Sequence, residues 1–245
     1  MAAKQPKLVL REACVHDASR DWTPGAFLEM GAGTGQMTRL FLERGFHGAC
    51  YDLGADSRRM ARDRLAGYGE RIAVVDDVAA LAPASFDYLF AFEVLEHIED
   101  DAAALAAWSR FVRPGGRALV SVPAHARKYG RSDELVGHVR RYEKRQLCAL
   151  LEQAGFDDVR IVNYGFPITE LTRTVSNRLV KADRSYDGLS PTERSIRSAQ
   201  AKPRAVKRVL SLFSGNLVLP FVVVQRWFYG MDLGDGYVAT AVRRG

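Results

Sequence analysis

The sequence predicts an α/β protein in which a mostly parallel β-sheet carries helices on both faces. From about residue 25 onward, short apolar runs typical of strands alternate with segments whose apolar residues recur at helical spacing. Parallel strands need crossover connections, and helices in those connections cover both faces of the sheet. The 245 residues, 47% of them hydrophobic, are enough to bury one core, as a single domain or as a domain with a subdomain.

The predicted strands are apolar runs rich in β-branched and aromatic residues, each bounded by glycine or polar residues. In chain order they are AFLEM (26–30), GACYD (48–52), IAVVDD (72–77), FDYLFAF (86–92), GGRALVSVP (115–123) and VRIVNY (159–164). The predicted helices place apolar side chains three or four positions apart, which gathers them on one face. They are QMTRLFLERG (36–45), ADSRRMARDRLA (55–66), DDAAALAAWSRFV (100–112) and EKRQLCALLEQAG (143–155).

Segments on either side of this alternation are predicted to lie around the core, which spans residues 25–163. Residues 1–24 are predicted to form a helical lead-in that caps the site at the strand ends. Residues 164–230 are predicted to form a helical insertion on the substrate side, before a final strand within 231–245. The insertion is basic, and its stretch 203–230 ends in an apolar run and three aromatic residues. This pattern is typical of a lid over a hydrophobic pocket, which we favour, or of a peripheral contact with an anionic membrane.

Composition narrows the class of protein further. The apolar run LVLPFVVV holds eight residues and a proline, too short to cross a bilayer, and the amino-terminal stretch has no signal-peptide core. We therefore expect a soluble, cytoplasmic protein. The cysteines lie far apart without C-x-x-C spacing, which favours reduced packing thiols: Cys14, Cys50 and Cys148. The net charge of +6 is mild, and no aromatic and basic residues interleave, so a nucleic-acid partner is not expected.

The segment FLEMGAGTGQM (27–37) joins the first predicted strand to the first helix through a glycine loop. Gly31, Gly33 and Gly35 permit a tight turn and a close approach of the backbone to a ligand. A glycine loop by itself also fits a dinucleotide site. Here, however, Gln36 stands where the dinucleotide fingerprint has its third glycine, and Glu29 precedes the loop. A carboxylate at that place repels a pyrophosphate and suits a ligand with an ammonium group.

Acidic residues also follow the next two predicted strands. Asp52 ends the second strand, where it can accept hydrogen bonds from a ribose diol, and Asp77 follows the third, where it can receive an adenine amino group. Ligands of α/β proteins bind at the carboxyl ends of parallel strands, so both carboxylates are expected at one edge of the sheet. In the alternative interpretation, Asp77 only caps the next turn.

Together these motifs resemble the class I S-adenosylmethionine-dependent methyltransferases. E-x-G-x-G-x-G, then YD, DDV and FDYLFAFEVLEHIED followed by RFVRPGGRALVSVP, occur in the order and spacing of that family over residues 25–163. The resemblance implies a Rossmann-like seven-stranded sheet whose antiparallel last strand, GYVATAVRR (236–244), lies beside VRIVNY. It also implies S-adenosyl-L-methionine as cofactor, lined by Glu29, Gly31, Ala32, Gly33, Gly35, Asp52, Leu53, Asp77, Val78 and Phe92. Phe92 also fits a core position.

The stretch EVLEH places two carboxylates and an imidazole directly after the fourth predicted strand. On a helical turn Glu93, Glu96 and His97 would occupy positions i, i+3 and i+4 and share one face, which invites a divalent cation. This spacing is similar to that of ubiquinone-pathway O-methyltransferases and small-RNA 2′-O-methyltransferases, in which a later histidine completes a metal site. The resemblance implies His138 as that histidine, with His125 as a weaker substitute.

The predicted catalytic residues are His138, His97 and Glu96, and their chemistry is open to three interpretations. Oxygen and imidazole ligands suit Mg²⁺, Mn²⁺, Fe²⁺ or Zn²⁺, and the sequence does not select among them. A bound metal lowers the pKa of a substrate hydroxyl and fixes its oxygen for attack on the methyl group. Without a metal, His138 or His97 could act as a general base. In the third interpretation, the glutamates cap a helix start and the histidine packs against it.

The segment GHVRRY resembles bacterial methyltransferases that act on sugars, lipid-linked glycans or secondary metabolites. Arg140 and Arg141 could clamp a carboxylate or phosphate, or form a solvated face. The leading functional hypothesis is O-methylation of a hydroxyl on a small molecule, a sugar or a lipid-linked glycan. The alternatives are N-methylation of a small amine, a nucleic-acid methyltransferase and a non-catalytic protein that binds the cofactor. The acceptor and the oligomeric state are not determined by the sequence.

Overall fold

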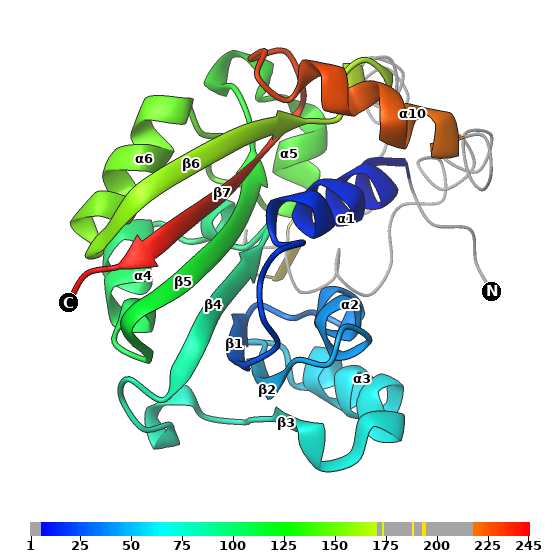
Figure 1. Ribbon diagram of the computed structural model, residues 1–245. Coiled ribbons are helices and arrows are strands. Elements are labelled where there is room, and N and C mark those ends of the chain that lie inside the picture. Colours follow the sequence, from blue (N-terminus) through cyan, green and yellow to red (C-terminus); the bar gives the residue numbers. More distant parts are fainter. Residues whose placement is uncertain (1–5, 171–172, 174–187, 189–192, 195–217) are drawn as a thin grey trace.

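A seven-stranded sheet forms the centre of the computed structural model, which describes residues 6–170, 173, 188, 193–194 and 218–245 (Figure 1). The strand order is β3-β2-β1-β4-β5-β7-β6. The strands are β1 (Ala26–Met30), β2 (His47–Tyr51), β3 (Ile72–Val74), β4 (Phe86–Phe92), β5 (Val112–Pro123), β6 (Phe156–Tyr164) and β7 (Gly236–Arg243). All pairings from β3 to β5 are parallel, whereas β7 is antiparallel to β5 and β6. The predicted sheet with an antiparallel last strand is therefore confirmed.

Helices cover both faces of this sheet, as predicted. Their bounds are α1 (Pro6–Ala18), α2 (Gln36–Leu42), α3 (Ala55–Leu65), α4 (Asp101–Ser109), α5 (Arg131–Val136), α6 (Lys144–Gln153) and α10 (Leu219–Val224). α4 and α6 bury leucines in the core on one face, and α1, α2 and α3 bury apolar residues in a second core on the other. Short 3₁₀ turns complete the connections: η1 (Ala66–Arg71), η2 (Val78–Ala80), η3 (Leu95–His97), η4 (Ala126–Lys128) and η6 (Gln225–Phe228).

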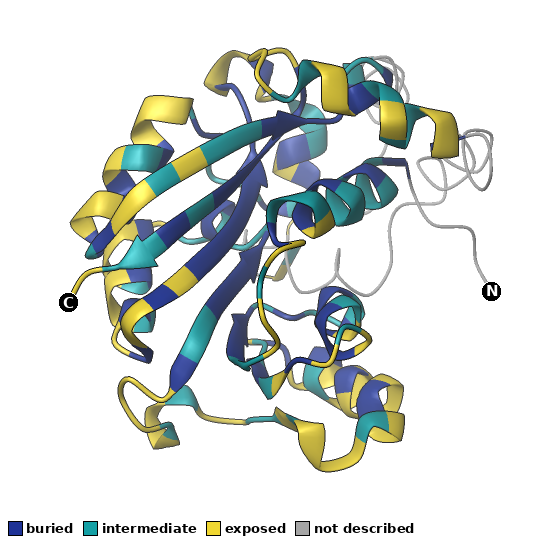
Figure 2. Cartoon of the chain, viewed as in Figure 1, coloured by how far each residue is buried: buried dark blue, intermediate teal, exposed yellow. Residues whose placement is uncertain are grey.

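Aromatic side chains of β4 hold the second core together. The Phe90 ring stacks on Phe41 of α2 with centroids 4.1 Å apart and on Phe27 of β1 at 5.2 Å. All three rings are fully buried, and Figure 2 shows the central strands as largely buried. Each such ring removes a large apolar surface from water and stabilises the fold by roughly 1.5–3 kcal/mol. This packing fixes β1 and β4 side by side, so their carboxyl ends lie at a common edge.

Local sequence explains where helices begin. The Asp100 carboxylate accepts a hydrogen bond from the Ala103 N–H (2.9 Å) at the first turn of α4. At α6 the Glu143 N–H donates to the Gln146 side chain (3.1 Å), which completes a capping box. Each cap satisfies a backbone donor that the helix itself leaves unpaired. These local signals account for the agreement between the predicted and observed helices of the core.

The segments outside the core are only partly described. The predicted insertion over 164–230 lies mostly outside the described residues, as does 203–217 of its basic stretch. Its final part, α10 and η6, packs on α1, where Gln225 donates to the Leu10 carbonyl (3.1 Å) and Arg226 pairs with Asp17 (2.8 Å). The division into 1–24, 25–163, 164–230 and 231–245 stays a prediction. Within the part of the chain that the structure describes, no helix is long and apolar enough to span a membrane.

Candidate functional site

The glycine loop between β1 and α2 is held in a left-handed conformation. Gly31, Gly33 and Gly35 have φ angles of 68°, 55° and 75°, a region that glycine enters without steric cost. A Cβ at Gly31 would overlap the Val94 side chain, whereas a Cβ at Gly33 would have no atom within 4 Å. The loop is therefore packed on one side and open on the other, which leaves room for a ligand against its backbone.

Asp52 lies against this loop, at the carboxyl end of β2. Its carboxylate accepts hydrogen bonds from the N–H of Gly33 (2.8 Å) and of Gly54 (2.9 Å). The neighbouring Leu53 is 63% exposed. An oriented carboxylate next to an open glycine backbone is a fitting environment for a ribose, which offers two hydroxyl donors.

Two other predicted cofactor residues have structural partners. Asp77 accepts a hydrogen bond from the Ala79 N–H (2.8 Å) and so caps η2, beside Val78. Phe92 is buried in the aromatic core, 6.1 Å from the Phe41 ring centroid. Both observations favour the capping and packing interpretations of these residues.

Glu29 is buried behind the glycine loop. The Thr38 hydroxyl donates to its carboxylate (2.6 Å), and only 1% of the residue is exposed. Burial raises the pKa of Glu29 to about 7, although the Thr38 hydrogen bond opposes this rise. A positively charged ligand group near the loop would favour the ionised carboxylate, because opposite charges attract strongly where water is excluded.

Helix α1 brings to the site two cations, Lys7 and Arg11, that were not among the predicted site residues. Lys7 forms an ion pair with Glu93 (2.9 Å), and the Arg11 guanidinium lies 3.8 Å from the same carboxylate. The buried Nε of Arg11 makes no hydrogen bond with any described residue. Gln36 of α2 donates to Glu12 (3.2 Å), which ties α1 to the glycine loop. The i, i+4 spacing of Lys7 and Arg11 was the available sequence signal, since it places both on one helix face.

Glu93 does not share a helical turn with Glu96 and His97, which corrects the sequence-based geometry. The 3₁₀ turn η3 begins at Leu95, and Glu93 has a left-handed φ of 55°. Its carboxylate also accepts a hydrogen bond from the Tyr164 hydroxyl (3.3 Å). Burial alone would raise the pKa of Glu93, but the Lys7 and Arg11 cations hold it well below its usual range. The ion pairs with Lys7 and Arg11 therefore hold the Glu93 carboxylate toward α1.

The structure brings Glu96, His97 and His138 together. One side-chain donor atom from each lies within 4.8 Å of the others. Two hydrogen bonds join these distant segments. The Val139 N–H donates to the Glu96 carbonyl (2.8 Å), and the His97 side chain donates from Nδ1 to the Gly137 carbonyl (3.1 Å). His138 Nε2 lies 3.7 Å from the Glu96 carboxylate.

The Glu96 carboxyl is fully buried, and neither of its oxygens has a hydrogen-bond partner among the described residues. Burial raises its pKa well above the usual range, and the nearby Glu93 charge adds to this rise. Leaving such a group without a partner costs free energy unless a ligand or cation satisfies it. A carboxylate beside two imidazoles is a donor set that suits Zn²⁺, Fe²⁺ or Mn²⁺.

Burial disfavours the charged form of both imidazoles, and His138 presents Nε2 to Glu96. Burial and the proximity of His138 lower the pKa of His97 to about 4, and burial also lowers the pKa of His138. The Nδ1 atom of His97 faces the Gly137 carbonyl, and that of His138 faces the Asp133 carboxylate (2.8 Å). Each Nδ1 therefore carries the proton, which leaves a lone pair on Nε2 for a metal or a proton.

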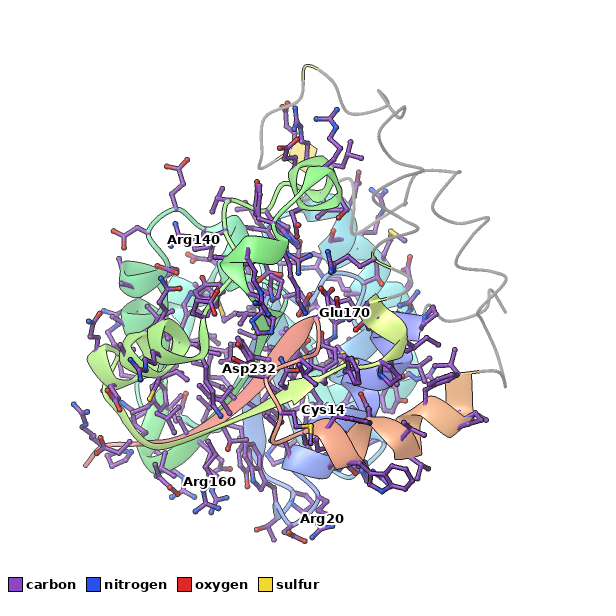
Figure 3. All side chains as sticks on the ribbon, turned by 90° about the horizontal axis from the view of Figure 1, so that it is seen from above. Cys14, Arg20, Arg140, Arg160, Glu170 and Asp232 are labelled. Atoms are coloured by element: carbon purple, nitrogen blue, oxygen red, sulfur yellow. The ribbon has the colours of Figure 1, made fainter. Side chains whose placement is uncertain are left out.

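The remaining candidates lie apart from the cluster. His125 is buried between Glu143 (3.7 Å) and Asp232 (3.6 Å). Arg141 is buried in ion pairs and is not free to clamp a substrate anion. Arg140, labelled in Figure 3, pairs with Asp101 (2.8 Å). Arg141 is therefore not part of a solvated face, and Arg140 is partly exposed but held in an ion pair.

Comparisons with known proteins agree with this architecture. A family model described as a methyltransferase domain matches residues 7–161. The ubiquinone biosynthesis O-methyltransferase of Xylella fastidiosa (strain 9a5c) is 34% identical over 98 residues, covering 38% of this chain and 40% of that protein. The protein of the same name from Xanthomonas campestris pv. campestris (strain B100) is 31% identical over 109 residues, covering 42% of this chain and 46% of that protein. The chain thus matches less than half the length of these curated relatives.

Solved structures share the fold. Phosphoethanolamine N-methyltransferase 2 of Haemonchus contortus, in complex with S-adenosyl-L-methionine, has a TM-score of 0.59 at 20% identity, covering 96% of this chain and 52% of that chain. The 1,6-didemethyltoxoflavin-N1-methyltransferase of Burkholderia thailandensis, bound to S-adenosylhomocysteine, has a TM-score of 0.55 at 19% identity, covering 96% and 76%. Because the family model spans well over half of the sequence, the chain belongs to the methyltransferase domain family, among the class I S-adenosylmethionine-dependent methyltransferases.

Proposed function

We propose that the protein transfers the methyl group of S-adenosyl-L-methionine to a hydroxyl oxygen of a small-molecule acceptor. The observation that carries this proposal is the buried Glu96 carboxyl, which has no hydrogen-bond partner among the described residues and lies beside the imidazoles of His97 and His138. Glu96 and His97 follow β4, whose carboxyl end lies beside that of β1 and its glycine loop, and His138 follows α5. The curated relatives of the matched segment are named as O-methyltransferases, which favours oxygen over nitrogen as the acceptor atom.

The open glycine loop and Asp52 would hold the adenosyl part of the cofactor, with Leu53 against its exposed side. When bound, S-adenosyl-L-methionine supplies a methyl group on a positively charged sulfur. Arg11 would bind the carboxylate of its methionine part, since no described residue accepts a hydrogen bond from its buried Nε. Glu29 would stabilise the ammonium group from behind the loop. Ala32, Asp77, Val78 and Phe92 stay predicted contacts.

Glu96, His97 and His138 would hold a divalent cation, and Glu93 stays a predicted fourth ligand beside them. The cation would supply positive charge that lowers the pKa of the acceptor hydroxyl. A metal-free reaction is the second candidate, favoured by the Asp133 contact that orients His138. There, His138 Nε2 takes the hydroxyl proton while the acceptor oxygen bonds to the methyl carbon and the carbon–sulfur bond breaks. The sulfur keeps the electron pair of that bond.

The acceptor class extends to a lipid-linked molecule presented at a membrane surface. Along α10 and η6, Leu219, Val223 and Trp227 are 54%, 53% and 75% exposed. They recur every fourth residue, so they share one face, and an exposed tryptophan is typical of membrane interfaces. Sedimentation with vesicles rich in anionic lipid would test this contact, which we expect Trp227→Ser to weaken. Equal recovery of the wild-type protein with and without vesicles would contradict it.

The central test combines metal content, chelation and matched variants. Formation of S-adenosylhomocysteine is followed with panels of hydroxyl and amine acceptors, before and after chelation. We expect hydroxyl acceptors to react, and Mn²⁺ or Mg²⁺ to restore activity after chelation. Glu96→Gln and His138→Ala should remove activity, whereas His47→Ala, an exposed histidine at the start of β2, should retain it. Full activity in both cluster variants would refute the proposal, and activity that survives chelation would favour the metal-free route.

A further inference from the structure

A chain of buried charges runs behind His138 and reaches the last strand of the sheet. The Asp133 carboxylate of α5 accepts three hydrogen bonds, from His138 Nδ1 (2.8 Å), Arg141 Nε (2.9 Å) and the Gly130 N–H (2.9 Å). The Arg141 guanidinium also donates to Asp235 (2.8 Å), directly before β7. The side chains of Asp133, Arg141 and Asp235 are only 2%, 4% and 7% exposed.

We infer that Asp133 and Arg141 are positioning residues that fix the tautomer and orientation of His138. This inference rests on the proposed function, in which His138 Nε2 faces the acceptor or a cation. The Asp133 carboxylate is a pure acceptor, so the His138 proton resides on Nδ1 and the lone pair on Nε2. The hydrogen bonds and ion pairs of both residues go to groups other than Glu96 and His97, so both act through His138.

Arg141 has a distinct part in this arrangement. Its planar guanidinium donates from Nε to Asp133 and from a terminal nitrogen to Asp235 and to the Ala124 carbonyl (3.2 Å). A lysine ammonium at this position is a single point and does not reproduce a fork that spans two carboxylates. The guanidinium therefore anchors Asp133 to the end of β5 and the start of β7. Rotation of Asp133 away from His138 would break these buried charge-assisted bonds.

Arg141 lies in the segment GHVRRY, next to Arg140. The sequence left two interpretations of this pair open, a clamp for a substrate anion or a solvated face, whereas burial between two carboxylates gives Arg141 an internal partner on each side. Arg140, next in the chain, has its partners elsewhere, at Asp101 and the Glu99 carbonyl. The two neighbours thus provide a test residue and a matched control of the same type.

The test uses the full chain and three variants, Asp133→Asn, Arg141→Lys and the control Arg140→Lys. Imidazole ¹⁵N chemical shifts of His138, assigned with His138→Gln, report the tautomer in metal-free protein. Zn²⁺ titration of the same samples reports affinity, and thermal unfolding identifies samples that are folded. We expect the wild type and Arg140→Lys to hold the Nδ1-protonated tautomer. We expect Asp133→Asn to populate both tautomers and to bind Zn²⁺ about 10- to 100-fold more weakly.

Arg141→Lys should shift the same signals in the same direction, by a smaller amount. Wild-type shifts and Zn²⁺ affinity in both folded variants would overturn the inference. If Asp133→Asn does not fold, Arg141→Lys alone decides by the same criterion. A wild-type protein that binds no Zn²⁺ would count against the proposed metal site only. In that case the ¹⁵N shifts still decide whether Asp133 and Arg141 position His138.

Discussion

Glu29 gives the protein a pH dependence of folding that can be worked from the structure. Burial raises its pKa from 4.5 to about 7. At about 1.4 kcal/mol per pKa unit, this change corresponds to roughly 3 kcal/mol. Because the folded protein binds the proton more tightly than the unfolded chain, the contribution is complete below the unfolded pKa. This stabilising contribution is lost as the pH rises from 4.5 to about 7. Above that pH, Glu29 no longer changes the free energy of unfolding.

The variant Glu29→Gln removes this titration and keeps an oxygen that can accept from Thr38. Urea unfolding of both proteins between pH 4 and 8 measures the difference. Relative to the variant, the wild type should lose roughly 3 kcal/mol of unfolding free energy over this interval. Parallel pH profiles would refute the reasoning, because they would mean that Glu29 ionises in the folded state as it does in water. Exposed Glu70→Gln serves as a control and should leave the profile unchanged.

Further outcomes concern the cluster, the loop and the core. Glu96→Ala and His138→Ala should each lower turnover by about 100-fold or more while cofactor affinity, measured by calorimetry, stays close to that of the wild type. Full turnover in both would contradict their roles. Gly31→Ala should lower the unfolding free energy by roughly 1–3 kcal/mol and weaken cofactor binding, because its φ of 68° and the Val94 side chain exclude a Cβ. Phe90→Ala should cost roughly 3–5 kcal/mol by denaturant unfolding, since it leaves a cavity among stacked rings.

The agreement between prediction and structure is closest where the physical signal is local. The apolar run of β4 and the helix after Asp100 are encoded by neighbouring residues, and both elements appear as predicted. The glycine loop follows for the same reason, because only glycine enters the left-handed region freely at three alternate positions. Helix α5 was not predicted, because its six residues between two glycines are too few to show a helical repeat of apolar side chains.

The candidate site was predicted in composition more than in geometry. Glu96, His97 and His138 were predicted from the sequence, but the prediction placed Glu93 on the same helical turn, whereas the turn begins at Leu95. The ion pair of Glu93 depends on Lys7 of α1, which is 86 residues away in the chain. No pattern among neighbouring residues of the sequence identifies an ion-pair partner that lies so far away in the chain.

The order of strands and helices, the glycine loop and the choice of acidic and imidazole residues were determined by the sequence itself, because periodicity and turn chemistry act over a few neighbouring positions. The tertiary structure decided which of these groups meet. It placed Arg11 and Lys7 beside Glu93, gave Arg141 two internal carboxylates, and buried Glu96 without a hydrogen-bond partner among the described residues. The reason is that burial and long-range charge pairing set the protonation and direction of a side chain, and both arise only when distant segments pack together.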